Sequence, residues 1–111
     1  MAAAQTLQLV SLVDLDRAYA AYPRARWKGK LMAVVRGTGA DEIGVGAKIH
    51  VAPKSSHEFE AVVIEVPTIR LAESSDVALV VEKPAFDALD GQATIEGGDI
   101  QMRSAERGMR S

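Results

Sequence analysis

Short apolar runs separated by turn-forming residues limit the fold of this chain more than any other feature of its sequence. They alternate apolar with polar positions, and Gly, Pro, Ser or Asp residues stand between them. The runs cover residues 6–10, 24–36, 47–52, 57–66, 68–72, 76–82, 92–96 and 99–103. Because they do not alternate with long helical patterns, we predict a mainly β (α+β) fold. Within that class we expect a small antiparallel β-barrel or sandwich of six to seven short strands.

Residues 11–22, SLVDLDRAYAAY, have helical spacing instead. Ser11 and Asp14 match a capping-box pattern, and apolar residues then recur three or four positions apart. Pro23 follows, and it disfavours helical geometry at the residue before it. The pattern predicts one N-terminal helix over about residues 11–22. A proline and a later glycine also predict a short helical turn near residues 84–90.

The segments AKIHVA and HEFEAVVIEV are predicted to pair as antiparallel strands. Opposing Ile49 to Phe59 gathers the apolar side chains on one face of the pair. On the other face this register sets His50 opposite Glu58, a candidate polar pair. His57 then faces away from His50, so the two histidines cannot share an ion, and we expect no metal site.

Two hairpins are predicted in the second half of the chain. TIRLA and DVALVVE flank the polar turn ESS, and QATIE and DIQMR flank Gly97–Gly98. A two-glycine turn suits the type I′ geometry of hairpins and would set Ile95 opposite Ile100. The phrase GGDIQMRSAER resembles the end of the small SH3-like barrel that closes biotin protein ligases. This resemblance implies two terminal hairpin strands, with a biotin-ligase active site lying elsewhere.

The chain of 111 residues is long enough for one domain, which we place at residues 1–103, followed by a flexible C-terminal tail at residues 104–111. It contains no cysteine, which excludes disulfides, thiolate metal sites and a cysteine nucleophile. We see no signal peptide, and no run approaches the ~20 apolar residues of a membrane span. We expect a cytoplasmic protein, or one within a particle assembled in the cytoplasm, with no membrane partner and no cofactor.

Charge is distributed unevenly along the chain, although the formal net charge is only −2. Residues 1–55 carry eight Lys/Arg against four Asp/Glu, whereas residues 56–111 carry five against eleven. A basic front and an acidic back attract each other, either within one subunit or between subunits. The asymmetry therefore favours a homo-oligomer or a protein partner.

The stretch PRARWKGK holds four cations, and an extended strand would place them all on one face. Arg24, Arg26, Lys28 and Lys30 share one parity, and Trp27 falls on the opposite side. A single-stranded nucleic acid would need cations and a stacking ring on the same side. Nucleic-acid-binding domains also tend to have a pI above about 9, whereas the pI here is about 5.6. A solvated or acid-paired face is the favoured interpretation, and nucleic-acid binding is disfavoured.

No group of residues forms a convincing catalytic cluster, so we predict no catalytic residues. The first functional hypothesis is a non-catalytic interaction or assembly module that self-associates or serves as a subunit of a larger complex, such as a phage or other multi-subunit particle. One alternative is nucleic-acid or polyanion binding through the basic strand at residues 24–30. The other is an enzyme or small-ligand-binding barrel whose pocket forms near His57 only in the tertiary structure.

Overall fold

Seven strands and two single-turn 3-10 helices make up the regular secondary structure of the computed structural model, which describes residues 6–54, 57–71, 73 and 75–102. The short helices are η1 (Ala25–Trp27) and η2 (Ala40–Glu42). The prediction of a mainly β fold is confirmed. The strands are β1 (Thr6–Asp14), β2 (Lys30–Arg36), β3 (Lys48–Pro53), β4 (Phe59–Glu65), β5 (Val77–Glu82), β6 (Thr94–Glu96) and β7 (Gly98–Met102).

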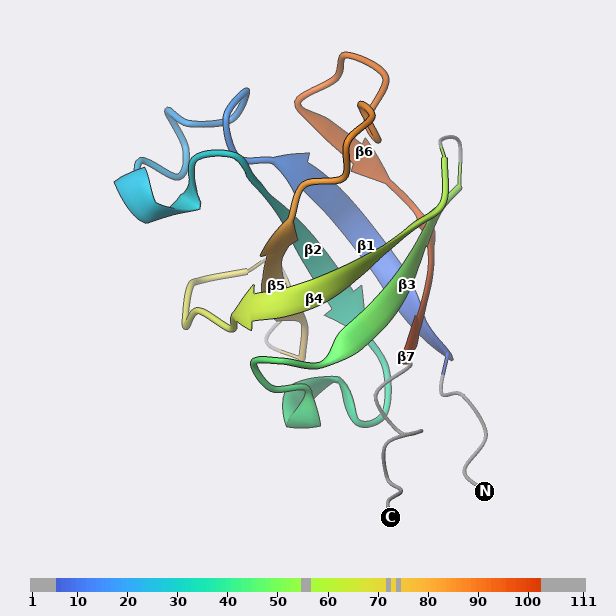
Figure 1. The fold of residues 1–111 in the computed structure, drawn as a ribbon. Coiled ribbons are helices and arrows are strands. Elements are labelled where there is room, and N and C mark those ends of the chain that lie inside the picture. The colour runs from blue at the N-terminus through green and yellow to red at the C-terminus, as the bar shows by residue number, and fades with distance from the viewer. Residues whose placement is uncertain (1–5, 55–56, 72, 74, 103–111) are drawn as a thin grey trace.

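The strands close into an antiparallel barrel (Figure 1). Six of them pair in the ring order β1–β2–β5–β4–β3–β7, and β7 returns to β1. β6 and β7 both pair with the same edge of β1, β6 near its end and β7 near its start. The two strands pair with β1 in one continuous register. Leu12 is opposite Ile95 there, as Leu7 is opposite Ile100. Closure pairs the strand edges that an open sheet would expose. Of the two architectures predicted, the structure is a small barrel.

Alternate residues of the barrel strands point inward and form the main core. The connection between β5 and β6 adds Ala88 and Leu89 to this core. Aliphatic side chains dominate it, as expected of a chain with few aromatic residues. The strand residues of this core are Leu7, Leu9, Leu12, Leu31, Ala33, Val35, Ile49, Val51, Phe59, Ala61, Val63, Leu79, Val81, Ile95 and Ile100.

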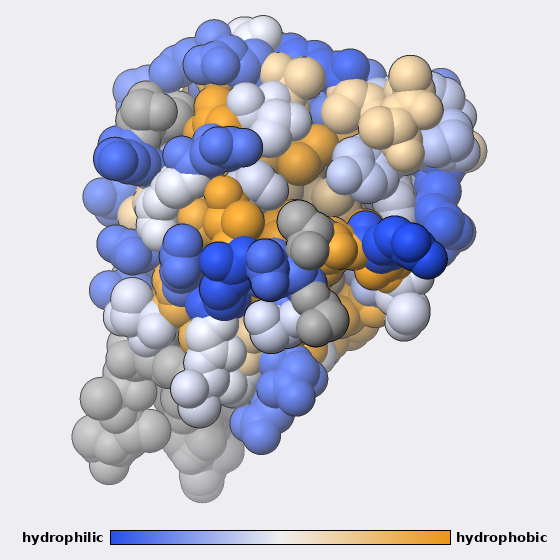
Figure 2. All heavy atoms as spheres, turned by 180° about the vertical axis from the view of Figure 1, so that it is seen from behind, coloured by the Kyte–Doolittle hydropathy of each residue, from blue (hydrophilic) through white to orange (hydrophobic). Residues whose placement is uncertain are grey.

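A second apolar cluster covers the outer face of β1, β2 and β5. Met32 and Val34 of β2 and Val80 of β5 pack there with Leu15 and Trp27, which come from the connection between β1 and β2. Strands buried on both faces read as continuous apolar runs, as KLMAVVR and VALVVE do. Seen from behind, hydrophobic side chains reach the surface between hydrophilic ones in the middle of the molecule (Figure 2).

The predicted N-terminal helix is wrong. Residues 11–14 complete β1, where Leu12 lies between β2 and β6. Pairing on both sides satisfies the backbone groups that a helix would satisfy internally. Turns follow at residues 15–21. Asp14, and not Ser11, caps them, because its Oδ1 accepts hydrogen bonds from the backbone N–H groups of the second and third residues that follow it.

The predicted terminal hairpin is also wrong, because residues 94–102 run in one direction along β1. Gly97 donates its N–H to β1, and its carbonyl accepts a hydrogen bond from the N–H of Lys54. The glycine pair therefore marks a bend between β6 and β7 and not a reversal. Gly98, with a φ of 134°, lies so close to β3 that a Cβ would come within 2.8 Å of Pro53 Cα.

Smaller differences concern the other predicted elements. The register of β3 with β4 differs from the prediction by two residues, with Ile49 opposite Ala61. A shift of two keeps the same side chains inside the barrel. TIRLA forms no strand among its described residues, whereas DVALVVE contains β5. Residues 84–90 form no helix, and a turn lies at residues 88–91. The predicted tail, residues 104–111, lies outside the described residues.

Candidate functional site

The segment that carries the four predicted surface cations becomes a strand only at Lys30. Residues 25–27 form η1, so the expected separation of the cations from the indole does not hold. The guanidinium carbons of Arg24 and Arg26 lie 4.9 and 5.6 Å from the ring centroid of Trp27. Trp27 is itself only 1% exposed, so its ring is closed to a stacking base.

Glu65 at the end of β4 holds this segment against the barrel. Arg26 donates from Nε at 3.0 Å and from Nη2 at 2.8 Å to the two carboxylate oxygens of Glu65. Trp27 Nε1 donates to Oε1 of the same carboxylate at 2.8 Å. The hydrogen bonds from Arg26 and then from Trp27 lower the pKa of Glu65 from 4.5 to about 2. Glu65 is therefore a carboxylate throughout the neutral range.

The register of β4 with β5 shifts between Val63 and Glu65. An irregularity of this kind turns the side chains that follow it to a new direction. Val63 points into the barrel core, and Ile64 packs against the outer cluster. The shift thus explains how Glu65 comes to face the connection between β1 and β2.

The other two cations of the segment have different neighbours. Lys28 Nζ lies 5.3 Å from the ring centroid of Tyr19. Lys30 Nζ lies 3.6 Å from Glu82 Oε1 across the β2–β5 pair. Two of the four cations, Arg26 and Lys30, therefore face carboxylates, and three, again including Arg26, lie over aromatic rings. Each of the four cations thus contacts a carboxylate or an aromatic ring of its own chain.

Ion pairs join the basic front half of the chain to its acidic back half within one barrel. Arg36 Nε lies 2.7 Å from Asp76 Oδ1, and this carboxylate is almost fully buried. The hydrogen bond from Arg36 lowers the pKa of Asp76. One subunit therefore satisfies much of the attraction expected between the halves. The pairs that cross between them include Arg17–Asp87, Arg26–Glu65, Lys30–Glu82 and Arg36–Asp76.

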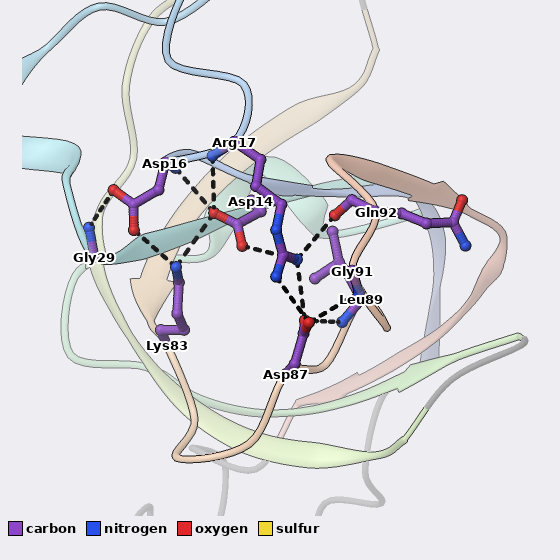
Figure 3. Close-up of polar contacts among 9 residues, drawn as sticks. All are labelled: Asp14, Asp16, Arg17, Gly29, Lys83, Asp87, Leu89, Gly91 and Gln92. Atoms are coloured by element: carbon purple, nitrogen blue, oxygen red, sulfur yellow. Dashed lines mark hydrogen bonds and ion pairs between the residues drawn. The ribbon is translucent and has the colours of Figure 1, made fainter.

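A polar cluster anchors the connection between β5 and β6 (Figure 3). Lys83 Nζ lies 2.8 Å from Asp16 Oδ2 and 3.2 Å from Asp14 Oδ1. Arg17 Nη1 approaches the other oxygen of Asp14 at 3.3 Å. The Asp14 side chain is only 5% exposed, and a buried carboxylate without cations would be strongly destabilising. Two cations from different segments therefore share one buried charge.

Asp87 shapes the same connection. Its carboxylate accepts hydrogen bonds from Arg17 at 2.8 and 3.1 Å, and from the backbone N–H groups of Leu89 and Gly91. The hydrogen bond from Arg17 lowers the pKa of Asp87. Leu89 is buried in the main core, whereas Phe86 remains 43% exposed. The anchored loop thus contributes one residue to the core and presents an aromatic ring outward.

No sequence pattern predicts this polar cluster. Its residues come from positions 14–17 and 83–92, which share no motif and lie about 70 positions apart in the chain. Alternation of polar and apolar residues identifies strands, but it does not indicate which loops meet at the end of a barrel. Only the acidic pair at Asp14 and Asp16, directly after an apolar run, marks the place where β1 ends.

His50 and His57 lie in separate contacts. His50 Nε2 is 2.8 Å from Glu58 Oε1, a diagonal contact between neighbouring strands. The ring of His57 meets that of Phe86 edge-on, with centroids 5.8 Å apart, and its Nε2 lies 3.8 Å from Asp90 Oδ1. Among the described residues, no group of His, Asp and Glu is arranged to hold a metal ion.

An open depression of about 330 Å³ lies beside His57, lined by His57, Glu58 and Phe86. Phe86 also contacts the buried ring of Phe59, with centroids 6.3 Å apart. Small-molecule pockets enclose most of the surface of their ligand. The depression beside His57 is open, so it lacks the enclosure of such a pocket.

Comparison with known proteins identifies no relative of this chain. No protein-family model matches this chain, and neither a curated protein nor a solved structure matches it. No helix among the described residues is long and apolar enough to cross a membrane.

Proposed function

We propose that this chain is a non-catalytic β-barrel module that binds proteins. It acts as a self-associating subunit or as a subunit of a larger complex, in the cytoplasm or in a particle assembled there. Support comes from the use of its charged residues, many of which hold the connections of the barrel in place. The charge asymmetry is largely met within one subunit, so exposed apolar side chains are the stronger reason to expect a partner.

The single observation that carries this proposal is the exposed ring of Phe86 beside an open depression. Its loop is anchored through Lys83 and Asp87, so the ring is presented by an ordered part of the barrel. Aromatic side chains in depressions are enriched among the residues that dominate binding energy at protein interfaces. A rigid support lowers the entropy lost on binding.

Light scattering coupled to size-exclusion chromatography, over a wide range of protein concentration, tests the proposal. We expect the chain to associate and Phe86→Ala to raise the dissociation constant about tenfold or more, as truncation of a dominant interface residue does. Tyr19→Ala is the matched control, because Tyr19 is also aromatic and 36% exposed. A chain that stays monomeric at every concentration, or a Phe86 variant equal to the parent, contradicts self-association through this ring.

Polyanion binding is a second candidate function, and one observation supports it. Arg24 and Lys28 are exposed and lie over aromatic rings, and neither forms an ion pair with a carboxylate among the described residues. Such cations can neutralise phosphates without reading sequence. A mobility shift with a steep salt dependence, lost in Arg24→Glu/Lys28→Glu, would favour this candidate. Absence of any shift at low salt would remove it.

A further inference from the structure

The depression beside Phe86 has the chemistry of a site for a cationic side chain. Phe86 contributes an exposed ring, and Glu58 contributes a carboxylate to the lining. Asp90 brings a second carboxylate close to this lining, 3.8 Å from His57 Nε2. A guanidinium group stacks on aromatic rings and pairs with carboxylates at the same time. An arginine from another protein segment matches all three features.

One segment of this chain has the matching composition. Residues 103–111, RSAERGMRS, lie outside the described residues and contain three Arg against one Glu. The described residues contain ten Lys/Arg against fourteen Asp/Glu. The segment is thus net positive, whereas the described residues as a whole are net negative. Its Met109 also supplies a flexible apolar side chain that packs well against aromatic rings.

We propose that residues 103–111 of one copy occupy the Phe86 depression of a second copy. This inference rests on the proposed function, because it names the partner segment for that self-association. The Arg side chains approach Glu58 and Asp90, and their aliphatic stems lie against the ring of Phe86. The contact joins two different surfaces, so it is a head-to-tail association.

The direction of β7 favours a second copy over the same chain. β7 runs antiparallel to β3 and ends with Met102 opposite Ile49, near the start of β3. The depression lies past the other end of β3, at the connection that leads to His57 and β4. β7 therefore runs away from its own depression up to Met102, its last residue. Turning back would use about four of the nine residues before any arginine could approach it.

Two full-length variants test the inference by complementation. The first, Phe86→Ala/Glu58→Lys, changes the depression and leaves residues 103–111 intact. The second, Arg103→Glu/Arg107→Glu/Arg110→Glu, changes the segment and leaves the depression intact. Glu42→Lys is the control for a reversed surface charge, because Glu42 is exposed and lies outside the depression.

Each variant alone is expected to associate at least about tenfold more weakly than the parent, whereas Glu42→Lys associates as the parent does. An equimolar mixture of the two is expected to form a one-to-one heterodimer, since one copy supplies the segment and the other the depression. Native mass spectrometry separates this heterodimer from both homodimers. The heterodimer is also expected to weaken as salt rises.

Failure of this inference is distinguishable from failure of the proposed function. If the segment variant associates as strongly as the parent, self-association stands and the inference is overturned. The same holds if the mixture yields no heterodimer although the parent associates. If the parent is monomeric, a synthetic peptide of residues 103–111 is titrated into the segment variant. Shifted amide resonances at His57 and Phe86 support the site, and unchanged spectra overturn it.

Discussion

Trp27 and Glu65 form the contact that fixes the connection between β1 and β2. The indole belongs to the outer apolar cluster, and its only polar atom donates to a carboxylate held by Arg26. In the sequence the same residues look like one edge of a strand, because cations and apolar residues alternate from Arg24 to Lys30. Gly29, with a φ of 75°, separates η1 from β2 and allows the change of direction.

Glu65→Gln is expected to lower the free energy of unfolding by about 1.5–3 kcal/mol at neutral pH, since the negative charge and one of the two acceptor oxygens that Arg26 and Trp27 bind are lost. The pKa of Glu65 is about 2 in the folded chain and 4.5 in the unfolded chain. Between these pH values the folded state therefore binds fewer protons than the unfolded state. The stabilisation is therefore complete above about pH 4.5 and is lost as the pH falls towards 2. Urea unfolding of parent and variant at several pH values measures it.

Glu82→Gln provides the control for this measurement. Glu82 faces Lys30 at 3.6 Å, and its side chain is largely exposed, so its loss is expected to change stability by less than about 1 kcal/mol. A gap between the Glu65 variant and the parent that persists unchanged at pH 2 would show that charge is not its cause.

Among the elements, the bend between β6 and β7 depends on one glycine. A Cβ at Gly98 would contact the carbonyl oxygen of Ala52 and come within 2.9 Å of Lys54 N, and φ there is 134°. Gly98→Ala is expected to lower the free energy of unfolding by at least about 2 kcal/mol, because backbone and not a flexible side chain blocks the new atom. Thermal unfolding followed by circular dichroism measures this loss.

Gly44→Ala is the matched control, since a Cβ there meets nothing within 4 Å and φ is not positive. The same replacement at Gly44 is expected to be neutral or to stabilise by up to about 1 kcal/mol. Equal stability of the two alanine variants would contradict the close approach of β3 to the bend.

The loop between β5 and β6 is held by Asp87. Asp87→Ala removes the acceptor of the Leu89 and Gly91 N–H groups and the partner of Arg17. Amide exchange at residues 88–92 is expected to become several-fold faster, while that of β2 and β5 is unchanged, because the barrel ladders do not involve this carboxylate. Asp99→Ala serves as the control. Faster exchange throughout the barrel would show that Asp87 supports the whole fold.

At the scale of the whole molecule, two apolar clusters share one set of strands. β1, β2 and β5 send alternate side chains into the barrel and onto the outer face, so neither cluster persists without the other. Unfolding is therefore expected to be a single transition. Trp27 fluorescence reports the outer cluster and circular dichroism reports the barrel, and their urea midpoints are expected to coincide. An earlier fluorescence midpoint would show that the outer cluster opens first.

Alternation predicted the barrel strands well, and it assigned side chains such as Ile49 and Phe59 to the inside even though the β3–β4 register differed by two. Prediction from the sequence failed where one local pattern is compatible with two different structures. The segment after Ser11 has helical spacing, yet it also suits a strand buried between two neighbours. Gly97–Gly98 suits a tight reversal as well as a bend, and only pairing with β1 decides between them. The loop that presents Phe86 is set by contacts between distant segments, which no local pattern records.

The pairing of β1 with β7 places Thr6 directly opposite Gln101. The first and the last strand along the chain are therefore neighbours in the barrel, and a short linker would suffice to join them. New chain ends could then be opened in the loop at residues 37–45, before Gly46 donates its N–H to Val63 of β4. Such a circular permutation would change the order of the strands along the chain and leave their order around the barrel unchanged.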